Sequence, residues 1–149
     1  MSPETQSDKV VRRAASCTLH VKTARRTQLL DITREVQRAA REAGVQSGVC
    51  RLYVPHTTAG LTINENADPD VPHDIEEAMD RLVPKNGPYK HCEGNADAHI
   101  KSTLTGVSLS VEIEGGELQL GRWQGIFFCE YDGPRQREVR VRFVRDDVS

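Results

Sequence analysis

Three histidines lie in segments where their side chains could act on one ligand. His91 and His99 are eight residues apart, with acidic and amide side chains between them, and His56 ends a predicted strand after a proline. Imidazole is a common ligand of transition metals, and two or three imidazoles with an open position make a catalytic metal site. The spacing matches no strict metal signature, so each histidine could equally be a surface residue or a hydrogen-bonded cap.

A crowded run of amide and carboxylate side chains begins where a second predicted strand ends, at Asn64. A turn needs only one or two such residues, so the run has a surplus. Asp68 would cap the helix that follows, and Asn66 is a second candidate for this cap. Asn64 and Glu65 then remain for a site that also includes Asp74 of that helix. Carboxylates in such a site could bind Mg²⁺ or serve as a general base.

Isolated cations and one tryptophan are candidates for binding a phosphorylated ligand. Trp123 is the only tryptophan and lies between Arg122 and Gln124 in the predicted turn "GRWQG". Lys101 and Arg135 are further cations that could pair with phosphate. A tryptophan in a turn more often packs than binds, and most isolated cations are simply solvated.

Hydrophobic periodicity predicts the elements that must position these residues. Strands are predicted over residues 10–22, 48–56, 58–64, 107–113, 117–121, 125–131 and 137–144, and helices over 31–44, 68–84 and 97–106. Residues 1–9 are predicted to be a disordered tail, and residues 10–149 a single domain. The order β-α-β-β-α-α-β-β-β-β predicts a compact α+β fold with antiparallel sheets and few helices, in which the last four strands form a meander. The sequence does not decide whether the second and third strands pair as a hairpin.

Composition limits the class of protein. The chain has 149 residues, with 20 basic and 22 acidic side chains and a net charge of −2, which argues against a nucleic-acid partner. The sequence contains no apolar run long enough for a signal peptide or a membrane span, so no membrane partner is expected. Four cysteines occur without a CxxC spacing, which favours reduced thiols and a cytoplasmic location over disulfides.

Several motifs occur together and in order: "HTTAGLTINEN", "YKH", "AHIKSTLTG", "GRWQG" and "DGPR". In this respect the chain resembles the YjbQ-like family, sometimes described as secondary thiamine-phosphate synthases, over residues 15–143. The resemblance implies a compact α+β domain that assembles as a homotrimer. It also implies a divalent metal at His56, His91 and His99, with Asn64 and Glu65 as the paired polar site residues and Asp74 as the helix aspartate.

The activity that the resemblance implies is a transferase reaction on a small phosphorylated substrate. A hydroxymethylpyrimidine pyrophosphate would be joined to a thiazole phosphate, with release of pyrophosphate. Carboxylates would suit Mg²⁺, whereas three imidazoles suit Zn²⁺ better, and this tension leaves two alternatives open. One is a metal-dependent hydrolase or lyase that uses metal-bound water with Glu65 as the base, and the other is a non-catalytic trimeric protein that binds a metal or ligand.

Overall fold

The structure is a computed structural model that describes residues 14–146. The predicted tail over residues 1–9 and the first residues of the predicted strand 10–22 lie outside the described residues. The strands are β1 (Ala14–Lys22), β2 (Gln28–Asp31), β3 (Ser47–Tyr53), β4 (Ala59–Glu65), β5 (Ser108–Glu114), β6 (Glu117–Leu118), β7 (Gln124–Glu130) and β8 (Gln136–Arg145). The helices are α2 (Thr33–Ala43), α3 (Asp70–Leu82) and α4 (Ala96–Thr105).

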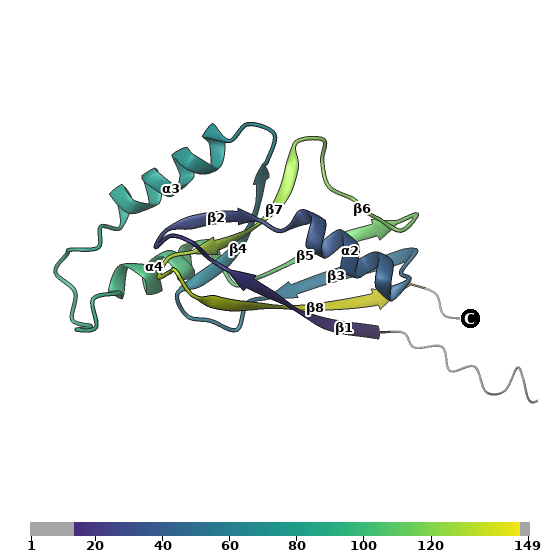
Figure 1. The fold of residues 1–149 in the computed structure, drawn as a ribbon, viewed down its shortest axis with the longest axis horizontal. Coiled ribbons are helices and arrows are strands. Elements are labelled where there is room, and N and C mark those ends of the chain that lie inside the picture. Colours follow the sequence, from purple (N-terminus) through teal and green to yellow (C-terminus); the bar gives the residue numbers. More distant parts are fainter. Residues whose placement is uncertain (1–13, 147–149) are drawn as a thin grey trace, which may run out of the picture.

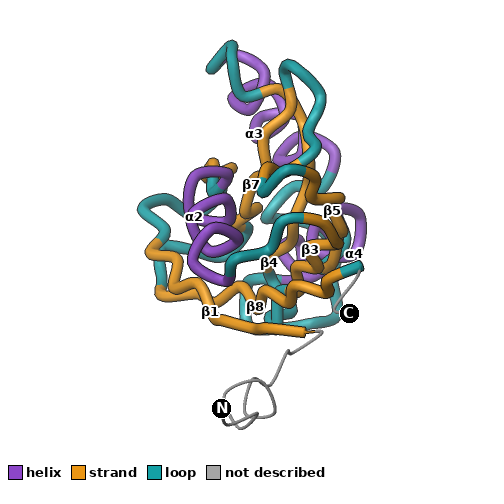
Figure 2. The backbone as a smooth tube through the Cα atoms, turned by 90° about the vertical axis from the view of Figure 1, so that its right-hand side faces the viewer, coloured by secondary structure: helices purple, strands orange, loops and turns teal. Residues whose placement is uncertain are grey.

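Two antiparallel sheets form the body of the molecule. One has five strands in the order β1-β8-β3-β5-β6, and the other has three in the order β2-β7-β4. Helices α3 and α4 lie at one end of the molecule and α2 lies toward the other (Figures 1 and 2). The predicted α+β class with antiparallel sheets is therefore confirmed.

The predicted meander of the last four strands is wrong. Strand β7 belongs to the three-stranded sheet, and β8 lies between β1 and β3 in the other one. The physical reason is burial: all but the first residue of β7 are buried, so this strand is covered on both faces. Strand β8 instead alternates, with Val139, Val141 and Phe143 buried and Arg140 and Arg142 exposed. A strand that is covered on both faces needs a different place in the fold from a strand with one exposed face, so β7 and β8 belong to different sheets.

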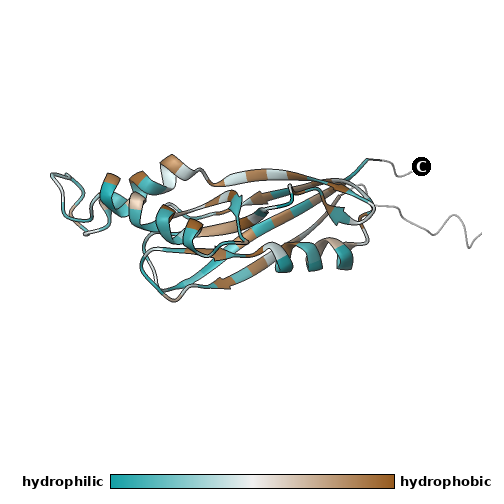
Figure 3. Ribbon diagram, turned by 90° about the horizontal axis from the view of Figure 1, so that it is seen from above, coloured by the Kyte–Doolittle hydropathy of each residue, from teal (hydrophilic) through white to brown (hydrophobic). Residues whose placement is uncertain are grey.

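The main core lies between the two sheets and under α2. It contains buried side chains from both sheets and the helix, including Val36, Leu52, Phe128, Val139 and Phe143. A smaller cluster under α3 and α4 contains Leu29, Ala98, Phe127, Cys129 and Tyr131. Figure 3 shows the alternation of apolar and polar residues along the strands and the polar outer side of α2.

Helix α2 begins and ends where the sequence predicts. Asp31 Oδ1 accepts a hydrogen bond from the Thr33 N–H at 2.9 Å, which satisfies one free donor at the helix start. Gly44 ends the helix with φ of 70°, in the left-handed region that glycine adopts without a Cβ penalty. Val36 and Ala40 on the inner face are fully buried.

Helix α4 packs directly on β4 because Gly60 has no side chain. A Cβ at Gly60 would lie 2.5 Å from the Gly106 carbonyl oxygen at the end of the helix. Ser102 Oγ donates a hydrogen bond to the Ala59 carbonyl at 2.7 Å, and Leu61 N–H donates to Gly106 O at 3.0 Å. This close contact explains why the "HTTAG" motif contains a glycine in a strand.

Helix α3 packs only some of its apolar side chains against the rest of the protein. Ile75 and Met79 pack on the smaller core cluster, but Leu82 is 74% exposed. The buried residue of the helix is Glu76, whose carboxylate accepts hydrogen bonds from the Leu29 N–H at 2.7 Å and from Arg25. The helix is therefore fixed by polar contacts as much as by apolar ones.

The sequence did not predict β2, and it left the pairing of β3 with β4 open. Strand β2 has four residues, too few to show a period, and it pairs with β7. Strands β3 and β4 belong to different sheets, so residues 54–58 cross between the sheets instead of forming a hairpin. No helix within residues 14–146 is long and apolar enough to cross a membrane.

Candidate functional site

Two of the three predicted histidines face each other at the start of α4. His91 lies in the loop before the helix, and His99 lies one turn into it. Their ring centroids are 5.1 Å apart and their planes are nearly perpendicular, at 86°. His91 Nε2 also lies 3.6 Å from a Glu93 carboxylate oxygen. The arrangement presents two imidazoles to one small volume.

That volume is a pocket of about 520 Å³, which we call the α4 pocket. Besides the two histidines, its walls are formed by Pro88, Tyr89, Lys90, Ala96 and Ile100. A second hollow on the same loop shares Tyr89, His91 and Ala96 with it and also contacts Lys85. Tyr89 Oη donates a hydrogen bond to the Pro84 carbonyl at 2.5 Å, which fixes the aromatic wall. The pocket thus combines apolar walls with imidazole and ammonium groups.

A buried charge network fixes the inner side of α4, opposite His99. The Asp97 carboxylate is fully buried and accepts hydrogen bonds from Arg26 at 2.9 and 3.0 Å and from Lys101 Nζ at 2.9 Å. Lys101 Nζ also donates to Asp80 at 2.6 Å. Burial alone would raise the pKa of Asp97, but the hydrogen bonds from Arg26 and Lys101 lower it to about 2. With its inner side anchored, the helix holds His99 on its outer side.

The residue before α4 is held by the loop that follows β7. Asn95 Nδ2 donates a hydrogen bond to Asp132 at 2.9 Å, and Asp132 also pairs with Arg135 at 3.0 Å. Asn95 Oδ1 is buried and has no hydrogen-bond partner within the described part of the chain. The start of α4 is therefore tied to the "DGPR" segment, far along the sequence.

His56 lies in the segment between β3 and β4 and makes its hydrogen bond with β8, not with the histidine pair. Its Nε2 accepts a hydrogen bond from the Glu138 N–H at 2.9 Å, which places the proton of the neutral ring on Nδ1. Burial and then the charge of Arg137 lower the pKa of His56. Among the described residues, no three His, Cys, Asp or Glu side chains form a group that could hold a metal ion. Within the described residues of one chain, His56 is therefore not brought together with His91 and His99, because the crossing from β3 to β4 fixes His56 against β8.

A second buried ion pair joins the two sheets. Arg137 Nε on β8 donates to Glu130 Oε1 on β7 at 2.9 Å, and Arg137 Nη2 donates to Thr58 Oγ1 at 2.8 Å. Thr23 Oγ1 donates to Glu130 at 2.8 Å. Burial alone would raise the pKa of Glu130, but hydrogen bonds from Arg137, the Asp132 N–H and Thr23 lower it. This pair is satisfied on all sides and fixes the turn that carries His56.

Side chains of the polar run after β4 make hydrogen bonds at the start of α3 and within the neighbouring strands. Asp68 Oδ1 accepts a hydrogen bond from the Asp70 N–H at 2.9 Å, at the first residue of α3. Asn66 makes no capping hydrogen bond to that helix, and its Nδ2 donates to Asp31 Oδ2 at 3.0 Å. Asn64 Oδ1 accepts from the Glu65 N–H at 2.7 Å.

The predicted carboxylate site is not brought next to the histidines. Glu65 is half-buried and lies opposite Gln124, and Asp74 is exposed on α3. In the part of the chain that the structure describes, no hydrogen bond or ion pair joins Asp74 to Asn64 or Glu65. Six strand steps from Ala59 to Glu65, at about 3.3 Å each, separate the two ends of β4 by roughly 20 Å, and His56 precedes the end that begins at Ala59. Glu65 therefore lies at the other end of β4 from His56.

The predicted phosphate-binding cations differ in whether they are accessible. Lys101 is fully buried between two carboxylates and cannot reach a ligand in this arrangement. The Arg135 side chain is 49% exposed but pairs with Asp132. The Arg122 guanidinium carbon lies 4.8 Å from the Trp123 ring centroid, a cation–π contact on the surface. Gln124 Oε1 accepts from the Gly121 N–H at 2.7 Å and so closes the turn.

Sequence reasoning missed the buried charges that hold the α4 region. A signal for one of them existed, since Arg137 stands at an inward position of β8, two residues before the buried Val139. Glu130 directly follows the apolar run of β7, which also indicates burial. Nothing local distinguishes Arg26, whose partner Asp97 is far along the chain.

The sequence and structure match known proteins over most of the chain. The family model described as UPF0047 protein YjbQ-like matches residues 17–146. The UPF0047 protein MJ1081 of Methanocaldococcus jannaschii is 53% identical over 126 residues, which cover 85% of this chain and 91% of that protein. The UPF0047 protein YugU of Bacillus subtilis is 49% identical over 128 residues, covering 85% of this chain and 97% of that protein.

Solved structures show the same fold. A YjbQ/UPF0047 family protein from Clostridium acetobutylicum has a TM-score of 0.84 at 52% identity, covering 86% of this chain and 99% of that one. A protein from Sulfolobus solfataricus, described as YbjQ-like and of unknown function, has a TM-score of 0.85 at 31% identity, covering 89% and 98% of the two chains.

These findings correct the predicted activity. The relatives are named only as UPF0047 or YjbQ-like proteins, and nothing in them points to thiamine-phosphate synthesis. The metal-dependent alternatives rested on a histidine cluster, which the described residues do not form within one chain. The transferase prediction is therefore overturned, because the motifs identify a family and a fold and not a reaction.

Proposed function

We propose, from the premise that the chain belongs to the YjbQ-like UPF0047 family, that it acts on a small phosphorylated molecule in the α4 pocket. His91 and His99 accept and donate the protons of that reaction. The observation that carries the proposal is the pair of imidazoles, 5.1 Å apart, at the rim of a pocket with apolar walls.

The chemistry of imidazole supports this role. Histidine is the side chain whose ordinary pKa allows both protonation states near neutral pH. Two imidazoles beside one bound molecule can therefore divide the work, with the neutral ring accepting a proton while the protonated ring donates one. The His99 ring is held on a helix whose inner side is fixed by Asp97 and Lys101, so its position is set before a ligand arrives.

The lining of the pocket favours an anionic ligand with an apolar part. Lys90 lies in the α4 pocket, and Lys85 lies in the hollow that shares Tyr89 with it. Ammonium groups bind phosphate oxygens through charge-assisted hydrogen bonds. Ile100 and Tyr89 offer apolar surface to the remainder of the molecule. The buried Lys101 has no part in this contact, because its donors are used within the protein.

The proposal also includes a divalent ion and a homotrimer. Two imidazoles are half of the ligand set that Zn²⁺ usually takes, and Mg²⁺ prefers oxygen ligands, so the pair does not fit either ion by itself. An ion would need further ligands from the bound molecule or from a second copy of the chain, and proton transfer by the pair does not depend on it. A cytoplasmic location agrees with the four free cysteines.

The test compares His91→Gln and His99→Gln with the control His73→Gln, which alters an exposed histidine on α3. A panel of phosphate monoesters is incubated with each protein, and conversion is followed by phosphorus NMR. Loss of a general acid or base should slow turnover by about 10²–10⁴-fold in each pocket variant, with the control unchanged. The imidazole NMR signals of His91 and His99 should also shift when a substrate is added. Equal turnover in wild type and both pocket variants would reject the proposal.

A further inference from the structure

The outer face of the five-stranded sheet carries an ordered set of cationic and hydroxyl side chains. The strand register aligns Ser16, Arg142, Arg51 and Ser110 in one row across β1, β8, β3 and β5. The next row with the same orientation contains Thr18, Arg140, Tyr53 and Ser108. Side chains two residues apart on a strand point to the same face, so both rows face outward together.

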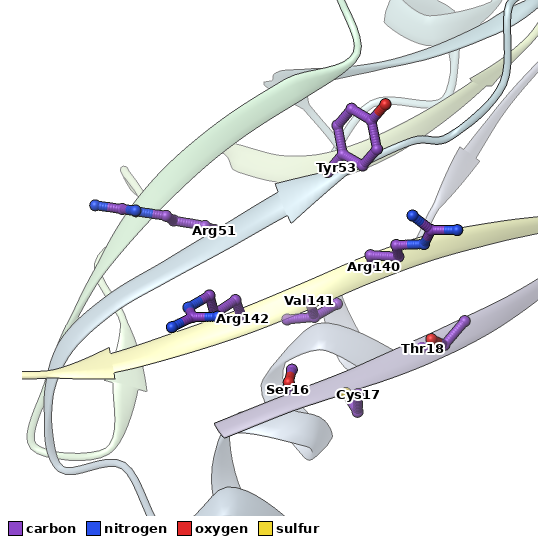
Figure 4. A pocket seen from close by; sticks show the side chains of 8 residues that line it. All are labelled: Ser16, Cys17, Thr18, Arg51, Tyr53, Arg140, Val141 and Arg142. Atoms are coloured by element: carbon purple, nitrogen blue, oxygen red, sulfur yellow. The ribbon is translucent and has the colours of Figure 1, made fainter. Parts of the chain in front are cut away.

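These two rows form a pocket that differs from the α4 pocket. The pocket has a volume of about 450 Å³, and its polar lining comes from Ser16, Thr18, Arg51, Tyr53, Arg140 and Arg142. None of its lining residues lines the α4 pocket. Figure 4 shows the three arginines and Tyr53 on neighbouring strands, with Arg51 and Arg142 extended toward the same end of the sheet. We call this surface the arginine face.

The arginines are close together with little compensating charge. Arg51 and Arg142 are direct partners across β3 and β8, and like charges in this position destabilise a sheet. Within residues 14–146, neither has an ion pair or a side-chain hydrogen bond. Arg140 has one weak partner, because its Nε lies 3.9 Å from a Glu138 carboxylate oxygen. Glu112 lies on β5 opposite Val49, one row beyond Arg51.

We propose that the arginine face binds a small molecule carrying two or more linked phosphate groups. Guanidinium groups recognise phosphate through paired hydrogen bonds, and two of them side by side can grip one phosphate. Arg51 and Arg142 take the first phosphate and Arg140, two residues along β8, takes the next. The hydroxyls of Ser16 and Thr18 add donors at the edge, and the ring of Tyr53, a residue that is 47% exposed, packs against the organic part of the ligand.

Other occupants fit the observations less well. A second copy of the chain that met this face with its own would bring arginines against arginines. A nucleic acid would favour a basic excess, whereas the chain has a net charge of −2. The hollow shape suits a single small ligand. This site lies on another face from the α4 pocket and does not depend on the function proposed there.

The test measures binding of inorganic tripolyphosphate by isothermal titration calorimetry at low and physiological salt. The double variant Arg51→Gln/Arg142→Gln should bind about tenfold or more weakly, because charge-assisted hydrogen bonds are lost. The control Arg34→Gln/Arg38→Gln removes the same charge from exposed positions on α2 and should bind as the wild type does. Added salt should weaken wild-type binding, since the site is exposed.

Thermal unfolding of the same variants supplies a second readout. Removing the opposed pair Arg51 and Arg142 should raise the unfolding midpoint while it weakens tripolyphosphate binding, which a merely structural role would not do. The part of tripolyphosphate binding that is lost in Arg51→Gln/Arg142→Gln should be retained in His91→Gln, which separates this site from the α4 pocket. Equal losses in the two double variants, or no binding by the wild type at millimolar concentration, would overturn the assignment. So would a single-stranded oligonucleotide that binds through the same arginines more tightly than tripolyphosphate.

Discussion

His56 is used as a hydrogen-bond acceptor, and this makes its protonation costly. Its Nε2 receives the Glu138 N–H at 2.9 Å, so a proton on that nitrogen would replace an attraction by a repulsion. Burial and the neighbouring charge of Arg137 act in the same direction and lower the pKa of His56. In the unfolded chain the same imidazole titrates at about 6.5.

A pH dependence of stability follows from this residue. The folded pKa is below the unfolded one, so the contribution of His56 is fully present above about pH 6.5 and is lost as pH falls toward the folded pKa. His56→Gln keeps an acceptor but cannot titrate, so its free energy of unfolding should fall less between pH 7 and pH 5 than that of the wild type. Urea unfolding at both pH values measures this difference. The control is His20→Gln, an exposed histidine opposite Glu138 on β1, and an equal flattening in that variant would contradict the assignment to His56.

At the residue scale, the sequence predicts which side chains are chemically able to take part in a site. It predicts less well which of these side chains lie next to one another. His91 and His99 are only eight residues apart in the sequence, so the sequence indicates that their imidazoles can lie close together. His56 depends on a crossing between sheets that no local pattern reveals. Burial of Lys101 is also invisible in the sequence, because it results from Asp80 and Asp97 on two helices that come together only in the fold.

At the scale of elements, the inner side of α4 depends on one carboxylate. Asp97→Asn should leave Arg26 and Lys101 without a buried counterion and cost about 3–5 kcal/mol of stability. Asp80→Asn removes the other partner of Lys101, but its side chain is 51% exposed, so it should cost about 1 kcal/mol or less. Chemical denaturation of both variants at pH 7 checks this order, and equal costs would show that Asp97 is not the anchor.

Acid should weaken the same anchor in a defined range. The pKa of Asp97 is lowered to about 2, below its unfolded value of about 3.9. Its contribution is therefore present above about pH 4 and is lost as pH falls toward 2.

Elements with a clear period were predicted well, and their arrangement was not. Helix α2 and the alternating strand β8 follow their patterns closely. Strand β2 was not predicted because four residues are too few to show a period, and its place is set by pairing with β7. Helix α3 carries an apolar stripe, but the two sheets leave only part of it covered, so Leu82 stays exposed.

At the scale of the molecule, one end exposes apolar side chains beside the α4 pocket. Ile100 and Leu104 on α4 are 40% and 63% exposed, and Leu82 on α3 is 74% exposed. Exposed apolar side chains gathered in one region favour association. We expect a trimer, so light scattering should return three times the chain mass of 16.6 kDa. Leu104→Glu should shift the mass toward that of a monomer, whereas Arg38→Glu on α2 should not, and a monomeric wild type at micromolar concentration would contradict this prediction.

The position of β8 has a consequence for how the chain is made. This strand is the last in the sequence among those described, yet it lies between β1 and β3, and Ala14 of β1 pairs with Val144 of β8. During translation, β1 and β3 are released from the ribosome long before the strand that joins them. The emerging chain therefore presents unpaired strand edges until its C-terminal part is complete, and such edges are prone to aggregation. Formation of the five-stranded sheet is thus a late event, which occurs only once nearly the whole polypeptide has been synthesised.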